Sequence, residues 1–142
     1  MSSINDFPAR GKVIRVEGDA VIFAPSNTTY QLKLSAPGFN GPVKALLEGF
    51  IRAKARKMWT VASGGNFVTP IHGPTRILQG RIKYLDNQLM VVQAGTPVVV
   101  QLPTDDSAYD LNNGALTVGS LVNATLMPGA TFQLAVVGAA IT

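Results

Sequence analysis

The feature that most restricts the fold of this 142-residue chain is an order of short apolar segments and turns that occurs twice. Gly11-Lys12-Val13 has a counterpart in Gly80-Arg81-Ile82, displaced by 69 residues. Further matches follow in the same order: Val21-Ile22-Phe23 with Met90-Val91-Val92 at 69, Gln31-Leu32 with Gln101-Leu102 at 70, and Ile51, Ala53 and Ala55 with Val122, Ala124 and Leu126 at 71. Surface loops accept insertions readily, so a slowly growing offset predicts a tandem duplication.

Each copy is rich in segments typical of short β-strands. In the first copy, Lys12 to Val16 and Ala20 to Ala24 are joined by a short turn-like segment, which predicts a hairpin. Thr29 to Leu34 alternates polar and apolar residues, the period of a half-buried strand. Pro42 to Gly49 carries the start and stop signals of a short helix, and so does Thr104 to Gly114 in the second copy.

The segment that follows Phe50 has the clearest alternation in the chain. It predicts a strand with Ile51, Ala53, Ala55 and Trp59 buried on one side, together with their counterparts Val122, Ala124, Leu126 and Phe132. Arg56-Lys57-Met58 interrupts the pattern. By comparison with Met127-Pro128-Gly129 it is the tip of a hairpin, or else it belongs to a continuous, bent strand.

The resulting order in each copy, three strands, a short helix and two strands, resembles that of the five-stranded OB-fold barrel. The resemblance covers the layout alone, and no motif residues are carried over. We therefore expect an all-β protein made of two tandem OB-like units with one short helix each. Its parts are a flexible N-terminal tail (1–10), a basic first repeat (11–62), a linker rich in Gly and Pro (63–79) and a second repeat (80–142).

Composition and charge restrict location and partners. The absence of Cys excludes disulfides and thiolate metal sites. Met1 to Pro8 has no basic segment leading into an apolar one, and Leu134 to Ile141 is too short to span a bilayer, so we expect a cytoplasmic protein without membrane insertion. Residues 1–79 contain ten Lys and Arg against four Asp and Glu, whereas residues 80–142 contain two against four. The basic character therefore belongs to the first half.

A basic row is the sharpest functional signal. Arg52, Lys54 and Arg56 recur at a spacing of two, so all three would project from one side of a strand over about 14 Å. A groove lined by such residues suits the phosphates of single-stranded nucleic acid or another polyanion. Exposed Lys and Arg also protect strand edges from pairing, which remains the alternative reading. The predicted binding residues are Arg52, Lys54, Arg56, Lys57, Arg10, Lys12, Arg15 and Arg76, with Tyr30 as an exposed aromatic residue.

No pattern in the sequence indicates catalysis, a metal or a cofactor. His72 is the single His, and no nucleophile elbow accompanies it. The loop Ser63-Gly64-Gly65-Asn66 lacks the frame of a phosphate-binding P-loop, so it reads as linker. We expect a binding protein without enzymatic activity. The alternative is a structural subunit that forms homo-oligomers through sheet edges or faces, since few residues are charged and the C-terminal segment is apolar.

Overall fold

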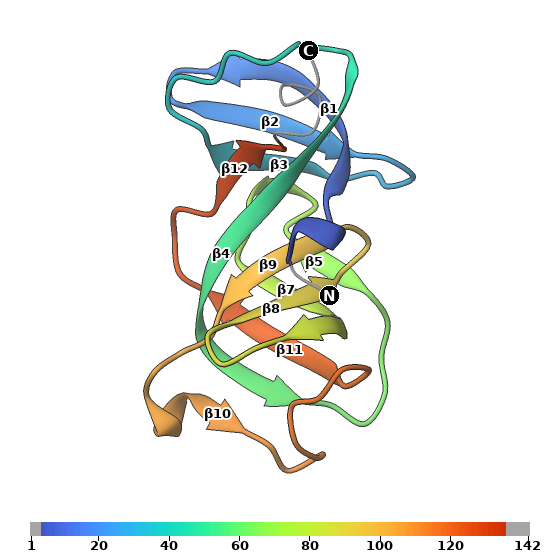
Figure 1. The fold of residues 1–142 in the computed structure, drawn as a ribbon, viewed down its shortest axis with the longest axis vertical. Coiled ribbons are helices and arrows are strands. Elements are labelled where there is room, and N and C mark those ends of the chain that lie inside the picture. The colour runs from blue at the N-terminus through green and yellow to red at the C-terminus, as the bar shows by residue number, and fades with distance from the viewer. Residues whose placement is uncertain (1–3, 136–142) are drawn as a thin grey trace.

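The computed structural model describes residues 4–135 as an all-β molecule, which confirms the predicted class (Figure 1). Twelve strands form one mixed sheet. Helical structure in these residues is limited to two 3-10 turns, η1 (Ile4–Asp6) and η2 (Asp106–Ala108). The strands are β1 (Ala9–Glu17), β2 (Ala20–Pro25), β3 (Gln31–Ser35), β4 (Leu46–Thr60), β5 (Phe67–Thr69), β6 (His72–Pro74), β7 (Ile77–Leu85), β8 (Leu89–Gln93), β9 (Pro97–Gln101), β10 (Tyr109–Asp110), β11 (Leu121–Leu126) and β12 (Thr131–Leu134).

Strand β4 joins two groups of strands. The main order in the sheet is β1-β2-β3-β12-β4-β11-β7-β8-β9, and β4 additionally pairs with β1 and with β9. The path β1-β2-β3-β12-β4 therefore returns to β1, and the path β4-β11-β7-β8-β9 returns to β4. We call these paths the first and the second circuit. In Figure 1 the long β4 ribbon runs from the β1–β3 group to the β7–β9 group.

The partners of β4 change along its length. Residues 46–49 pair with β1, and residues 49–52 pair with β12, both antiparallel. Residues 51–54 pair in parallel with β9, and residues 55–60 pair antiparallel with β11. The strand passes through Arg56-Lys57-Met58 without a turn, so this segment is part of a continuous strand and not a hairpin tip.

The two three-stranded meanders have closely similar registers. Val13 pairs with Phe23 between β1 and β2, and Ile82 pairs with Val92 between β7 and β8, an offset of 69 on both strands. A register shift follows Val13 in β1, and another follows Ile82 in β7 at the equivalent position. The hairpin matches made from the sequence therefore agree with the observed pairing.

Elsewhere the observed pairs have offsets that differ from the matches made from the sequence. Leu34 lies opposite Val21, and Val100 lies opposite Met90, so these partners on β3 and β9 differ by 66 and not 70. Gly11 pairs with Leu47 of β4, and Gly80 pairs with Val122 of β11, so these partners differ by 75 and not 71.

The core lies between the inward sides of the strands. Ile51, Ala53 and Ala55 are buried as predicted, and so are Val122, Ala124, Leu126 and Phe132. A second, smaller cluster lies on the outer side of β8 and β9, where Val91 and Val99 pack with Phe50. Ile4 and Phe7 pack against this cluster, so the N-terminal segment covers part of that surface.

The predicted helix between Pro42 and Gly49 is wrong. Lys44 has a left-handed backbone (φ 65°) and donates its N–H to the carbonyl of Val13 at 2.7 Å, and β4 begins at Leu46. Pairing with β1 thus outweighs the local helix signals. In the second half, the helix predicted for residues 104–114 is reduced to the 3-10 turn η2. Strand β1 begins at Ala9, and the segment 63–79 contains β5, β6 and the start of β7.

Candidate functional site

The outer side of β4 carries the basic row. Because Ile51, Ala53 and Ala55 point into the core, the alternating residues between them point away from it. Arg52 is half-buried, whereas Lys54, Arg56 and Lys57 are exposed. Lys54, Arg56 and Lys57 form no ion pair or side-chain hydrogen bond within residues 4–135, so their charges are free to meet a ligand.

A β-bulge in β4 changes which residues face outward. In the ladder with β11, Leu126 lies opposite Ala55 and Thr125 lies opposite Lys57, so Arg56 has no partner. One extra residue in a strand inverts the inward and outward phase beyond it. Met58 is consequently buried (1% exposed), and Trp59 is only half-buried. The prediction that Trp59 is a core residue is therefore wrong, and its ring lies on the outer side, two residues from Lys57.

The remaining predicted cations divide into two groups. Arg10 forms an ion pair with Glu48, and Arg15 forms one with Glu17, so a carboxylate already compensates each of these charges. The side-chain hydrogen bond from Arg15 is the main reason why the pKa of Glu17 lies below its ordinary value. Lys12 is exposed on β1, opposite the first residue of β4 and away from the bulge.

Arg76 lies closer to the basic row. Its carbonyl accepts the N–H of Leu126 at 2.7 Å, and Leu126 pairs with Ala55 of β4. The exposed Arg76 is therefore separated from the bulge by a single strand, β11. The structure thus brings together Arg52, Lys54, Arg56 and Lys57 on β4, with the backbone of Arg76 one strand away, and it places Arg10, Lys12 and Arg15 elsewhere.

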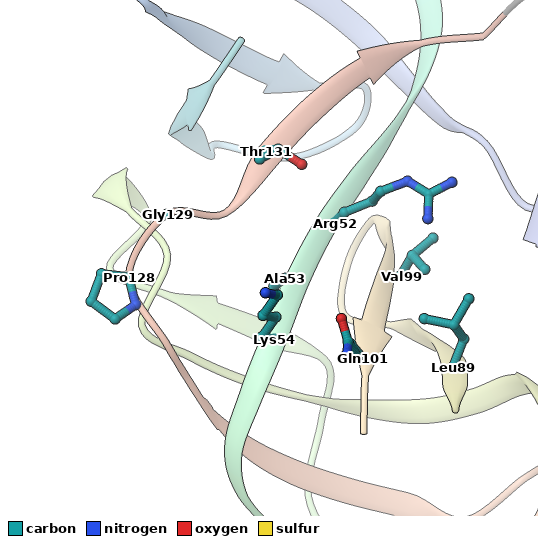
Figure 2. A pocket seen from close by; sticks show the side chains of 9 residues that line it. All are labelled: Arg52, Ala53, Lys54, Leu89, Val99, Gln101, Pro128, Gly129 and Thr131. Atoms are coloured by element: carbon teal, nitrogen blue, oxygen red, sulfur yellow. The ribbon is translucent and has the colours of Figure 1, made fainter. Parts of the chain in front are cut away.

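A cavity of about 370 Å³ lies beside the row, where β4 is flanked by β9 and by the segment that leads into β12. Figure 2 shows Arg52 extending from β4 on the side of Val99 and Leu89, with Gln101 below it and Thr131 on the β12 side. The described residues that line it are Arg52, Ala53, Lys54, Leu89, Val99, Gln101, Pro128, Gly129 and Thr131. They include two cationic side chains and no carboxylate, a composition that suits an anion.

A second cavity, of about 340 Å³, shares Arg52 with the first. Asn5, Phe50 and Gln133 are among its other lining residues, and none of the described lining residues is a carboxylate. A third cavity, of about 360 Å³, lies beside Trp59, between Lys57 and the segment Ser107 to Asp110. The outer side of β4 is therefore hollowed at both ends of the basic row.

Tyr30 is not an exposed aromatic residue as predicted, because it is 9% exposed and belongs to the core. Its hydroxyl donates to the carbonyl of Ala94 and accepts the N–H of Val68, both at 3.2 Å. These bonds tie the loop before β9 to β5. The alternation of Thr29 to Leu34 does not reveal them, since the partners are distant in sequence.

The other side-chain chemistry of the chain has structural explanations. Asp105 accepts hydrogen bonds from the N–H and hydroxyl of Ser107, which lower its pKa, and so it caps η2 as its spacing predicted. His72 is exposed in β6. Among residues 4–135, no group of three His, Asp or Glu side chains is arranged to hold a metal ion.

Comparisons with family models, with curated proteins and with solved structures found no match to this chain. In the described part of the chain, no helix has the length and apolar character needed to cross a membrane.

Proposed function

We propose that this chain is a non-catalytic protein that binds single-stranded nucleic acid, or a polyanion of similar charge spacing, along the outer side of β4. The proposal rests on one observation, which is that some cations of the chain are paired with carboxylates and others are not. Arg10 and Arg15 are paired with carboxylates, whereas Lys54, Arg56 and Lys57 are exposed and unpaired within residues 4–135. Unpaired cations in one row favour phosphate contacts that release counterions.

The fold proposed to support this function is a duplicated OB-like unit whose halves exchange one strand. In an OB-like arrangement each unit would close with its own fifth strand. Here β12, from the second half of the chain, lies between β3 and β4 in the first circuit. The distal part of β4, from the first half, lies between β9 and β11 in the second circuit. Each circuit is thus completed by a strand from the other half.

Two glycines support the duplication independently. A Cβ on Gly11 would collide with the carbonyl oxygen of Ala24, and a Cβ on Gly80 would collide with that of Gln93. Both the glycines and the two oxygens are separated by 69 residues. Each glycine also pairs on its other side with another strand of its circuit, β4 or β11. The same close approach therefore occurs at the same place in both units.

The exchange explains why the basic row can be long. A strand that ends in a hairpin after five or six residues offers two or three outward positions, whereas β4 has 15 residues. Its outward side carries Arg52 and Lys54, then Arg56 and Lys57 at the bulge, and then Trp59. Phosphates would contact the cations, and a base could stack on the half-exposed indole.

The alternative, self-assembly with further copies of the chain, is favoured by large apolar side chains that the described structure leaves in water. Leu46 is 67% exposed and Val118 is 64% exposed. If these residues mediate assembly, light scattering after size exclusion will give a mass above that of the monomer. Replacing both residues with Ser will then restore the monomer, whereas a wild-type protein that is already monomeric contradicts this alternative.

The proposal is tested by removing charge from the row and from a matched set elsewhere. The test variant carries Lys54→Ser, Arg56→Ser and Lys57→Ser, and the control carries Lys33→Ser, Lys44→Ser and Lys83→Ser, all at exposed positions. Both lose the same net charge. Fluorescence anisotropy with a labelled, mixed-sequence single strand should show at least about tenfold weaker binding for the test variant, and a change of about twofold for the control. Equal losses would show that only net charge matters, which contradicts the proposal.

A further inference from the structure

We infer that the cavity beside Arg52 is a discrete binding site for one phosphoryl group, with Arg52 as its main donor and Lys54, Gln101 and Thr131 as neighbours. This inference rests on the proposed function, because the phosphoryl group would belong to a nucleic-acid strand bound along β4. Free inorganic phosphate presents the same chemistry and can therefore serve as a probe of the site. It adds a position at which one phosphate is held by directed hydrogen bonds, beyond the general attraction of the basic row.

The composition of the cavity supports the binding of a phosphoryl group. Lys54 supplies an ammonium group, and Gln101 and Thr131 supply neutral groups that can donate hydrogen bonds. These side chains occupy adjacent ladder positions, since Arg52 lies opposite both Val99 and Thr131, and Lys54 lies opposite Gln101. The β-ladder therefore fixes the backbone positions of the four polar residues.

Arg52 differs from the other cations of the row in burial. Its Nε lies buried, without a hydrogen-bond partner among the described residues. A buried donor of this kind is unfavourable until an acceptor reaches it, and an oxyanion would provide a charge-assisted partner. Guanidinium groups also match phosphate geometry with two parallel N–H donors, which an ammonium group cannot do. Arg52, which lines the cavity, thus has a donor without a partner in a group that is suited to phosphate.

Arg52 also connects this cavity to its neighbour. The second cavity shares Arg52 and adds Asn5 and Gln133, again without a carboxylate among the described lining residues. A strand held at Arg52 could therefore continue into either cavity. The place of Arg52 at the junction makes it the anchor, whereas the exposed Arg56 lines neither cavity.

The experiment is a titration of the ¹⁵N-labelled full chain with inorganic phosphate, at constant ionic strength maintained with sodium chloride. It is observed through the arginine Nε–Hε signals and, for the Arg52 variants, which lack the Arg52 signal, through the backbone amide signal of Gln101. A second arm uses a short oligothymidylate. The variants are Arg52→Gln, Arg52→Lys and, as a matched control, Arg15→Gln, which removes the same charge at a residue that is paired with Glu17 on β1. Arg52→Lys keeps the charge but lacks Nε–H, so it separates directed hydrogen bonding from charge. Thermal melts of each variant establish that it is folded.

We expect phosphate to shift the Arg52 Nε–Hε signal with saturation. Phosphate affinity should fall about tenfold or more in Arg52→Gln, by about threefold or more in Arg52→Lys, and by less than about twofold in Arg15→Gln. No saturable shift at Arg52 in the wild type, or equal losses in Arg52→Gln and Arg15→Gln, would overturn the inference. Oligothymidylate binding that depends on Lys54, Arg56 and Lys57 without a shift at Arg52 would leave the proposed function intact. A phosphate response without oligothymidylate binding would instead reject the proposed function and retain the site.

Discussion

Replacing Gly80 with Ala, or Gly11 with Ala, should destabilise the protein by similar amounts. A Cβ on Gly80 would overlap the carbonyl oxygen of Gln93 and lie 2.7 Å from its carbonyl carbon. A Cβ on Gly11 would overlap the carbonyl oxygen of Ala24 and lie 2.7 Å from the Cα of Pro25. In both cases the obstruction includes backbone of the neighbouring strand, which cannot rotate away as a side chain can.

The size of the effect follows from this geometry. Overpacking a well-packed interior costs about 1–3 kcal/mol, and a backbone clash belongs at the upper end of that range. The gain of about 0.4–1 kcal/mol from restricting the unfolded chain opposes it. We therefore expect each variant to lose about 2 kcal/mol in the free energy of unfolding. Gly65→Ala is the control, because its Cβ would meet nothing within 4 Å.

Urea denaturation measures these differences, with Trp59 fluorescence reporting on β4 and far-ultraviolet circular dichroism reporting on the whole sheet. The midpoints of Gly11→Ala and Gly80→Ala should fall together while Gly65→Ala stays at or slightly above the wild type. If either variant remains within about 0.5 kcal/mol of the wild type, the close strand approach at that glycine is not as described. A large effect at one glycine alone would count against equivalent roles in a duplicated unit.

Three further predictions follow from the strand exchange, the bulge and a turn. Met58→Ala should lower the free energy of unfolding, measured by urea denaturation, by about 2–5 kcal/mol. Trp59→Ala should lower it by less but weaken oligonucleotide binding by about 1–3 kcal/mol. A larger loss of stability in Trp59→Ala than in Met58→Ala would contradict the bulge. Hydrogen bonds from backbone N–H groups lower the pKa of Asp86 below 3.8. The stabilising contribution of the Asp86 carboxylate is therefore present above its pKa in the unfolded chain and is lost as the pH falls through its pKa in the folded chain. Thermal melts of Asp86→Ala and the wild type should accordingly differ at neutral pH and converge in acid. A difference that stays constant with pH would contradict this prediction. Cleaving a protease site inserted between Ser63 and Gly64 should leave halves that co-elute on size exclusion, whereas halves that separate without denaturant would show that each folds alone.

The sequence predicted those parts of the fold that depend on local pattern. The β1–β2 and β7–β8 hairpins, and the burial of Ile51, Ala53 and Ala55, follow from periodicity and turn residues. The helix predicted from Pro42 to Gly49 failed because its signals are local, and long-range pairing of Leu46 and Leu47 with β1 outweighed them. The pairing of β12 with β3 and β4, and of the distal part of β4 with β9 and β11, was equally inaccessible, since local sequence patterns do not identify the partner of a strand.

The candidate site was predicted only in part, because it also depends on contacts between residues that are distant in the sequence. Alternation placed Arg52, Lys54 and Arg56 outside, and its interruption at Arg56-Lys57-Met58 coincides with the bulge. The interruption did not indicate which residues beyond it face inward, so Trp59 was assigned to the wrong side. Ion pairing also depends on distant partners. Arg10 could not be excluded from the basic set until Glu48 was known to lie opposite it in the adjacent strand.

The most direct test of the account is the salt dependence of oligonucleotide binding. If the cations of the basic row, Arg52, Lys54, Arg56 and Lys57, each contact one phosphate of a single strand, the slope of log K against log[salt] should be about −3, which is an affinity loss of about 60-fold between about 50 and 200 mM salt. The variant carrying Lys54→Ser, Arg56→Ser and Lys57→Ser should give a slope near −0.7, from the one remaining contact. Absence of binding by the wild type at about 50 mM salt, or equal slopes for the wild type and the variant, would contradict the claim that the outer side of β4 binds nucleic acid.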